Sequence, residues 1–99
     1  MEWLEIIKVQ GALSGFRNAD AELLKQLSLD TISADLICIR VYTHASVADD
    51  LVITLQWDTD LPSETGSTLA LNLARELKRH GLVDHSVWIE RLPEKRINQ

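Results

Sequence analysis

Apolar and polar residues alternate along two neighbouring runs in the middle of the chain, and this alternation predicts two β-strands. The runs are Leu36–Thr43 and Leu51–Trp57, and residues 44–50 between them are polar or small, which suits a hairpin loop. One side of the predicted pair is aliphatic, and we expect it to lie under helices. Its residues are Ile37, Ile39, Val41, Leu51, Ile53, Leu55 and Trp57. The other side is mixed, with Leu36, Cys38, Arg40, Tyr42, Val52, Thr54 and Gln56.

A strand and a helix are predicted before this hairpin. Trp3–Gln10 is rich in β-forming residues and is closed by glycine at position 11. Leucines at positions 23, 24 and 27 recur at helical spacing, and they predict an amphipathic helix from about Asp20 to Ser33.

A helix and a strand are predicted after it. Pro62 and Gly66 mark a loop, and Ser63 or Ser67 can cap the following helix. The apolar stripe of that helix is Leu69, Ala70, Leu73, Ala74 and Leu77. Gly81 stands where a left-handed C-cap residue is expected. A last strand is predicted over His85–Leu92, with Val87 and Ile89 on one face and Trp88 on the other.

This order of elements, β-α-β-β-α-β, predicts a ferredoxin-like α+β sandwich in which both helices cover one face of a four-stranded antiparallel sheet. We expect residues 1–99 to form one such domain, with a charged tail over residues 93–99. The uncovered face would expose Leu4, Ile6, Cys38, Tyr42, Val52 and Trp88. Because this is too much apolar surface for a small monomer, the sequence predicts a homodimer that packs through the sheet face.

Charge and composition narrow the classes of function. The 99 residues carry a net charge of −5, which argues against a nucleic-acid partner. No apolar run is long enough for a membrane span, so we expect no membrane partner. A single cysteine, Cys38, fits a reducing setting, and we expect a cytoplasmic protein.

The central hairpin resembles that of the antibiotic biosynthesis monooxygenase-like dimeric α/β barrels. The resemblance rests on IRVY before the hairpin turn, on QWDTD after it, and on Trp57, which ends the second strand of the hairpin. The resemblance implies that the chain forms a dimeric α/β barrel. The family includes cofactor-independent oxygenases that act on aromatic polyketides or quinols. A haem-degrading branch of that family uses an asparagine in the first strand, whereas this strand reads EIIKVQ, so we do not expect haem breakdown.

The resemblance also implies that Trp57 borders a substrate pocket, although a tryptophan at a strand end can equally fill the core. Arg40 and Tyr42 share a face with Gln56 or Thr54 and could share it with Trp88, and together these side chains could orient a polar aromatic molecule or an anion. The alternative is a dimer interface in which Arg40 pairs with a carboxylate such as Glu5 or Glu90 of the second subunit.

Of the three histidines, His80 is expected to be a cation at the helix C-terminus, whereas His44 and His85 could take part in proton transfer. His85 would be a general base if it faces a pocket, and otherwise a structural histidine. No metal-ligand spacing occurs, so we expect neither a metal nor a cofactor.

Two functions therefore remain open. One is a cofactor-independent, monooxygenase-like enzyme acting on an aromatic or quinol-type small molecule. In it, His85, Arg40 and Tyr42 would be catalytic, and Trp57, Gln56 and Trp88 would bind the substrate. The other is a non-catalytic module of ferredoxin-like fold that binds a ligand or another protein.

Overall fold

The computed structural model describes residues 1–11, 35–47 and 49–97, and it confirms the predicted ferredoxin-like α+β fold. Four strands form one antiparallel sheet in the order β2-β3-β1-β4. Their bounds are Glu2–Gln10 (β1), Leu36–Thr43 (β2), Leu51–Asp58 (β3) and Leu82–Ile89 (β4), and α2 spans Thr68–Leu77. The helix predicted over residues 20–33 lies outside the described residues.

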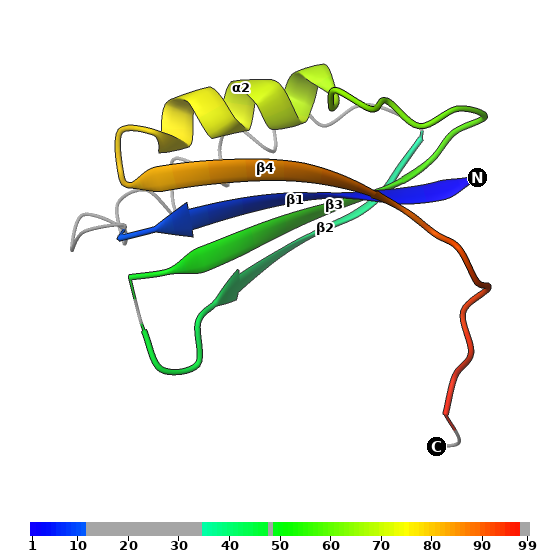
Figure 1. The fold of residues 1–99 in the computed structure, drawn as a ribbon, viewed down its shortest axis with the longest axis horizontal. Helices are drawn as coiled ribbons and strands as arrows, with labels where there is room; N and C mark the ends of the chain where they lie inside the picture. The colour runs from blue at the N-terminus through cyan, green and yellow to red at the C-terminus, as the bar shows by residue number, and fades with distance from the viewer. Residues whose placement is uncertain (12–34, 48, 98–99) are drawn as a thin grey trace.

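Helix α2 packs on one face of this sheet, which we call the inner face, and contacts β1 and β4 (Figure 1). Along the two central strands, burial alternates with a period of two residues, so every second side chain of β1 and β3 enters the core. The core is Trp3, Ile7, Val9, Leu51, Ile53, Leu55, Trp57, Ala70, Leu73, Ala74 and Leu77. The apolar stripe predicted for α2 is thus its buried side, apart from half-buried Leu69.

The opposite face of the sheet, which we call the outer face, carries the other set of alternating residues. Cross-strand register places Cys38 opposite Gln56 and Arg40 opposite Thr54, and Leu4 lies between Gln56 and Trp88. The predicted mixed side of the hairpin is therefore the outer face, with one exception. Leu36 pairs with Trp57 and packs against the core, because a bulge between Leu36 and Cys38 shifts the register. Ile37, predicted to be inward, lies in this bulge and is 48% exposed.

Two predicted boundaries near α2 were wrong. The helix ends at Leu77, and a turn follows in which the N–H of His80 bonds to the carbonyl of Leu77. Gly81 is not a left-handed cap, since its φ is not positive. Strand β4 begins at Leu82 rather than His85 and ends at Ile89, because it pairs with β1 from Gln10 to Trp3.

Among the described residues, no helix has the length and apolar character needed to cross a lipid bilayer.

Candidate functional site

A fully buried carboxylate lies at the centre of the inner face. Glu5 occupies an inward position of β1 between two core residues, Trp3 and Ile7, and none of its surface is exposed. Removing a carboxylate from water is costly unless hydrogen bonds or charges compensate it. The surroundings of Glu5 must therefore satisfy both of its oxygens.

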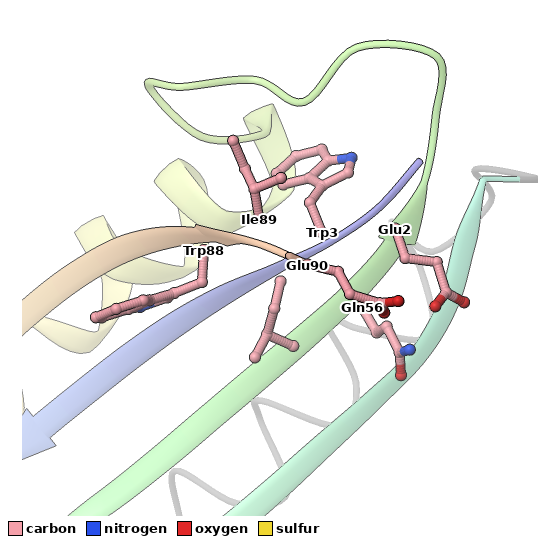
Figure 2. Close-up of a pocket in the computed structure, with 7 residues that line it drawn as sticks. Glu2, Trp3, Gln56, Trp88, Ile89 and Glu90 are labelled. Carbon is pink, nitrogen blue, oxygen red and sulfur yellow. The ribbon is translucent and has the colours of Figure 1, made fainter. Parts of the chain in front are cut away.

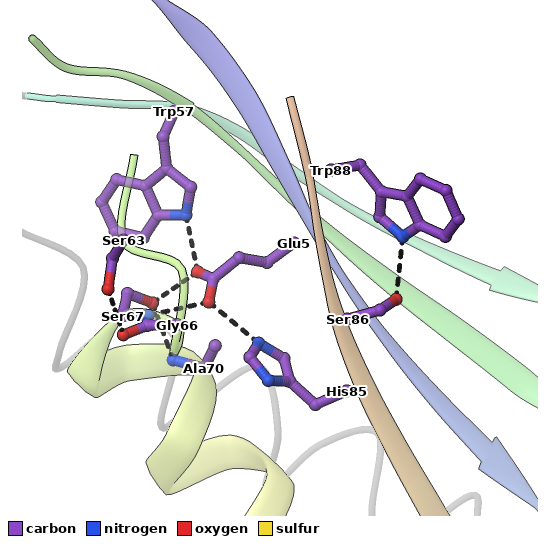
Figure 3. Close-up of polar contacts among 9 residues, drawn as sticks. All are labelled: Glu5, Trp57, Ser63, Gly66, Ser67, Ala70, His85, Ser86 and Trp88. Carbon is purple, nitrogen blue, oxygen red and sulfur yellow. Dashed lines mark hydrogen bonds and ion pairs between the residues drawn. The ribbon is translucent and has the colours of Figure 1, made fainter. Parts of the chain in front are cut away.

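Both oxygens of Glu5 are hydrogen-bonded, each to two groups (Figure 3). Oε2 accepts from Nε1 of Trp57 at 2.8 Å and from the Ser67 hydroxyl at 2.5 Å. Oε1 accepts from the backbone N–H of Ser67 at 2.7 Å and lies 2.9 Å from Nε2 of His85. These contacts draw on β3, the start of α2 and β4, so the carboxylate joins three elements that are distant in sequence.

Ser67 serves the helix and the carboxylate together. It is the N-cap of α2, with extended backbone angles, and its hydroxyl oxygen accepts from the N–H of Ala70 at 3.1 Å. The same hydroxyl donates to Glu5. Because one negative carboxylate also lies at the positive end of the α2 dipole, the helix N-terminus adds to its stabilisation.

Gly66 allows the side chains of His85 and Glu5 to lie close to the backbone just before α2. Its φ is +100°, a conformation that side chains other than glycine rarely adopt. A Cβ atom at this position would lie 2.3 Å from Cε1 of His85 and 2.9 Å from Oε1 of Glu5. The glycine in the sequence ETGS is therefore required by the histidine–carboxylate pair as well as by the turn.

Two tryptophans form an aromatic layer beside the carboxylate. The rings of Trp3 and Trp57 stack with centroids 5.7 Å apart and an interplanar angle of 17°. Nε1 of Trp3 donates to the Thr59 hydroxyl at 2.8 Å, whereas Nε1 of Trp57 donates to Glu5. Trp57 is therefore a core residue whose polar edge also belongs to the candidate site.

His85 is the titratable member of this cluster that solvent can reach. Its side chain keeps 16% of its surface accessible, while that of Glu5 keeps none. Within the described residues, Nδ1 of His85 has no hydrogen-bond partner, since the contact with Glu5 uses Nε2. A neutral His85 that donates Nε2–H to Glu5 would hold a lone pair on Nδ1. This arrangement suits proton transfer.

The residues predicted as a site fall on two faces of the sheet. His85 and Trp57 are brought together on the inner face by Glu5. Arg40, Tyr42, Gln56 and Trp88 lie on the outer face, as the register shows. Within one chain, Arg40 and Tyr42 therefore cannot touch a molecule held by His85. For the same reason, Glu5 cannot pair with Arg40 of a second subunit across the outer face.

Glu5 is the residue that sequence reasoning missed as part of the site. In WLEIIKV, alternation places it on the same side as Trp3, Ile7 and Val9. A charged residue at an inward position of a strand is rare unless hydrogen bonds or an opposite charge compensate it. This inward glutamate was therefore the feature of the sequence that could have indicated the site. Its partners Ser67 and His85 are 62 and 80 residues away in sequence, so only the fold could supply them.

The outer face has a hollow of about 340 Å³ near the start of β1 (Figure 2). It is lined by Glu2, Trp3, Leu4, Gln56, Trp88, Ile89 and Glu90. A hydrogen bond with the Glu90 carboxyl is the main cause that raises the pKa of Glu2, and burial and the negative charges nearby add to it. Trp88 is 58% exposed, and its Nε1 donates to Ser86 at 2.8 Å.

The remaining candidates have structural partners. The thiol of Cys38 lies 3.3 Å from Oε1 of Gln56. Nδ1 of His44 accepts from the backbone N–H groups of Ser46 and Val47, which closes the hairpin loop. In the described part of the chain, no group of three or more His, Cys, Asp or Glu side chains could hold a metal ion.

The architecture and the buried cluster together define a small α+β protein of ferredoxin-like fold. Among solved structures, the chain is similar to Rv0793 from Mycobacterium tuberculosis, with a TM-score of 0.68 and 16% sequence identity. The match covers 97% of this chain and 100% of that one, which shows a shared fold. No protein-family model matches the sequence, and no curated protein matches it.

Proposed function

We propose that the chain is a monooxygenase-like enzyme that acts without a cofactor on an aromatic or quinol-type small molecule, with His85 as its general base. The observation that carries this proposal is the 2.9 Å contact between His85 and Glu5, a carboxylate with no exposed surface. A carboxylate that fixes the orientation of an imidazole and stabilises the imidazolium is a recurrent device of acid–base catalysis.

His85 would take the proton of an acidic hydroxyl or of the carbon beside it. The imidazolium formed would be stabilised by Glu5, whose other oxygen remains hydrogen-bonded to Trp57 and Ser67. The electron-rich anion would then react with dioxygen. In the keto tautomer of the phenol, the reacting ring carbon is a CH₂ group; it becomes a carbonyl group, one oxygen atom of dioxygen enters the substrate and the other leaves as water, so the substrate supplies all four electrons.

The aromatic pair Trp3–Trp57 gives this base an apolar wall, since both rings are buried in the core. Its rings lie on the inner face next to Glu5, and Trp57 is hydrogen-bonded to the same carboxylate that holds His85. Arg40 and Tyr42 have no part in this mechanism, because the sheet separates them from His85.

We further propose that two copies of the chain pair through their outer faces. Tyr42, Leu82 and Trp88 are 48%, 76% and 58% exposed on this face. Leu4, Ile6 and Val52 lie half-buried among them. Several large apolar residues exposed on one face of a small chain favour an interface there. A second copy related by a two-fold axis would cover it with the same surface.

Oxygen uptake tests the proposed reaction. The wild-type chain should consume dioxygen with at least one member of a panel of quinols and polycyclic phenols. His85→Gln should lower the rate by about 100-fold or more, in the range that general-base catalysis contributes. His80→Gln, in the turn after α2, is the matched control and should keep the rate. If panel members bind and none is oxidised, the chain is instead a non-catalytic ligand-binding module.

A further inference from the structure

Charged groups on the outer face do not all find partners within one chain. Asp58 is paired with the N-terminal ammonium group at 3.0 Å. Lys8 and Asp84 stand opposite one another in the β1–β4 register, so each lies beside an opposite charge. Glu2 and Glu90 remain, and no ion pair joins either of them to a cation among the described residues.

Arg40 is a positively charged residue on the same outer face. Within the described part of the chain it has no carboxylate partner, and the main cause that raises the pKa of Arg40 is the neighbouring Tyr42 hydroxyl. A neutral hydroxyl leaves the charge of the guanidinium uncompensated. If a second copy covered the outer face, an unpaired guanidinium there would be costly.

Arg40 and the two glutamates of one chain are too far apart to pair. The strand register places Arg40 of β2 level with Thr54 of β3 and Ile6 of β1. Arg40 is therefore two strands away from β1, and its level on β1 is four residues along from Glu2. With about 4.8 Å between strands and about 3.4 Å per residue, the Cα atoms of Arg40 and Glu2 are roughly 17 Å apart. Arginine and glutamate side chains extended toward each other do not span that distance.

The hollow beside Glu2 and Glu90 is suited to a guanidinium group. Figure 2 shows the two carboxylates at one end of it, with Gln56 beside them and Trp88 along the strand. Two carboxylates and an amide oxygen can accept the forked N–H groups of an arginine. The exposed face of Trp88 adds a surface on which a guanidinium can stack.

We propose that Arg40 of one copy inserts into the Glu2–Glu90 hollow of a second copy, and that this contact, made twice by symmetry, sets the register of the two outer faces. The inference rests on the dimer of the proposed function and adds its specific recognition element. Opposite charges placed this way act chiefly on specificity, because a wrong register would bring like charges together or leave them unpaired.

A charge-swap experiment tests this pairing. Arg40→Glu should weaken self-association, measured by sedimentation equilibrium, by about 30-fold or more, since it sets three carboxylates together. The double variant Glu2→Lys/Glu90→Lys should weaken it similarly. When the two variants are mixed, each proposed contact again joins opposite charges. Native mass spectrometry should then show a heterodimer about as tight as the wild-type dimer.

The exposed substitution Glu64→Lys, on the loop before α2, is the matched control and should leave association unchanged. Two results would overturn the pairing while the dimer stands: variants that self-associate like wild type, or a mixture without preferential heterodimer. A wild-type chain that is monomeric by sedimentation would overturn both the dimer and the pairing.

Discussion

Oε1 of Glu5 lies 2.9 Å from Nε2 of His85, and it also accepts the backbone N–H of Ser67 at the start of α2. One carboxylate oxygen therefore fixes the histidine of β4 and the first turn of the helix together. The relationship makes the stability of the fold and the geometry of the proposed base depend on the same buried charge.

Replacing that charge should destabilise the chain. In Glu5→Gln, one of the two oxygens becomes an amide NH₂ group, which cannot accept the hydrogen bonds made there. We expect the free energy of unfolding to fall by about 2–4 kcal/mol, since buried donors would be left without acceptors. Urea unfolding measures the loss, and Glu64→Gln at an exposed position should change it by less than about 0.5 kcal/mol. An unchanged or higher stability would show that the network does not compensate the buried charge.

The two glycines of positive φ should respond differently to alanine. Gly11 has a φ of +70° and nothing within 4 Å of the added Cβ, so Gly11→Ala should cost only about 1 kcal/mol of backbone strain. At Gly66 the Cβ would also overlap His85 and Glu5. Gly66→Ala should therefore be clearly more destabilising and should shift the imidazole NMR signals of His85. Equal stability losses at both positions would mean that the contact with His85 does not constrain residue 66.

The two stacked tryptophans offer a second matched pair. Trp57→Phe removes a hydrogen bond to a buried carboxylate, which is worth about 1.5–3 kcal/mol. Trp3→Phe removes a bond to a neutral hydroxyl, worth about 0.5–1.5 kcal/mol. Both changes remove a similar apolar area. The difference between their urea midpoints therefore measures how much the hydrogen bond from Trp57 to Glu5 contributes beyond the bond from Trp3 to Thr59. A larger loss from Trp3→Phe would reverse the order we expect.

The raised pKa of Glu2 makes the stability of the folded chain depend on pH. Its pKa is raised from 4.5, chiefly by the hydrogen bond with Glu90, so the folded chain binds a proton more readily than the unfolded chain. The contribution of Glu2 to stability is therefore largest below about pH 4.5 and falls as pH rises through the raised pKa. Carbon-13 NMR titration should place the Glu2 pKa above 4.5, and Glu90→Gln should lower it. A Glu2 pKa that does not respond to Glu90→Gln would exclude Glu90 as the cause.

Alternation in the sequence predicted the sheet well, because the central strands β1 and β3 bury every second side chain. The edge strand β2 was predicted less well. Its bulge turns Leu36 inward and leaves Ile37 exposed, and nothing in LICIRVYT signals that extra residue. The site was predicted only in part, because His85 and Trp57 are linked by a glutamate far from both in sequence. Arg40 and Tyr42 were grouped with His85 by residue type alone, and β4 pairing places them on opposite faces.

Proton transfer from a phenol to His85 is the step that tests the central claim most directly. A nitrophenol added at a pH below its own pKa is neutral in solution, and its phenolate form has a distinct visible absorption band. Binding to the wild-type chain should produce the phenolate band, because His85, held by Glu5, takes the proton. The band should be lost in His85→Gln and kept in His80→Gln. A phenolate band of equal strength in His85→Gln, or none with the wild-type chain when the phenol is bound, would contradict the account.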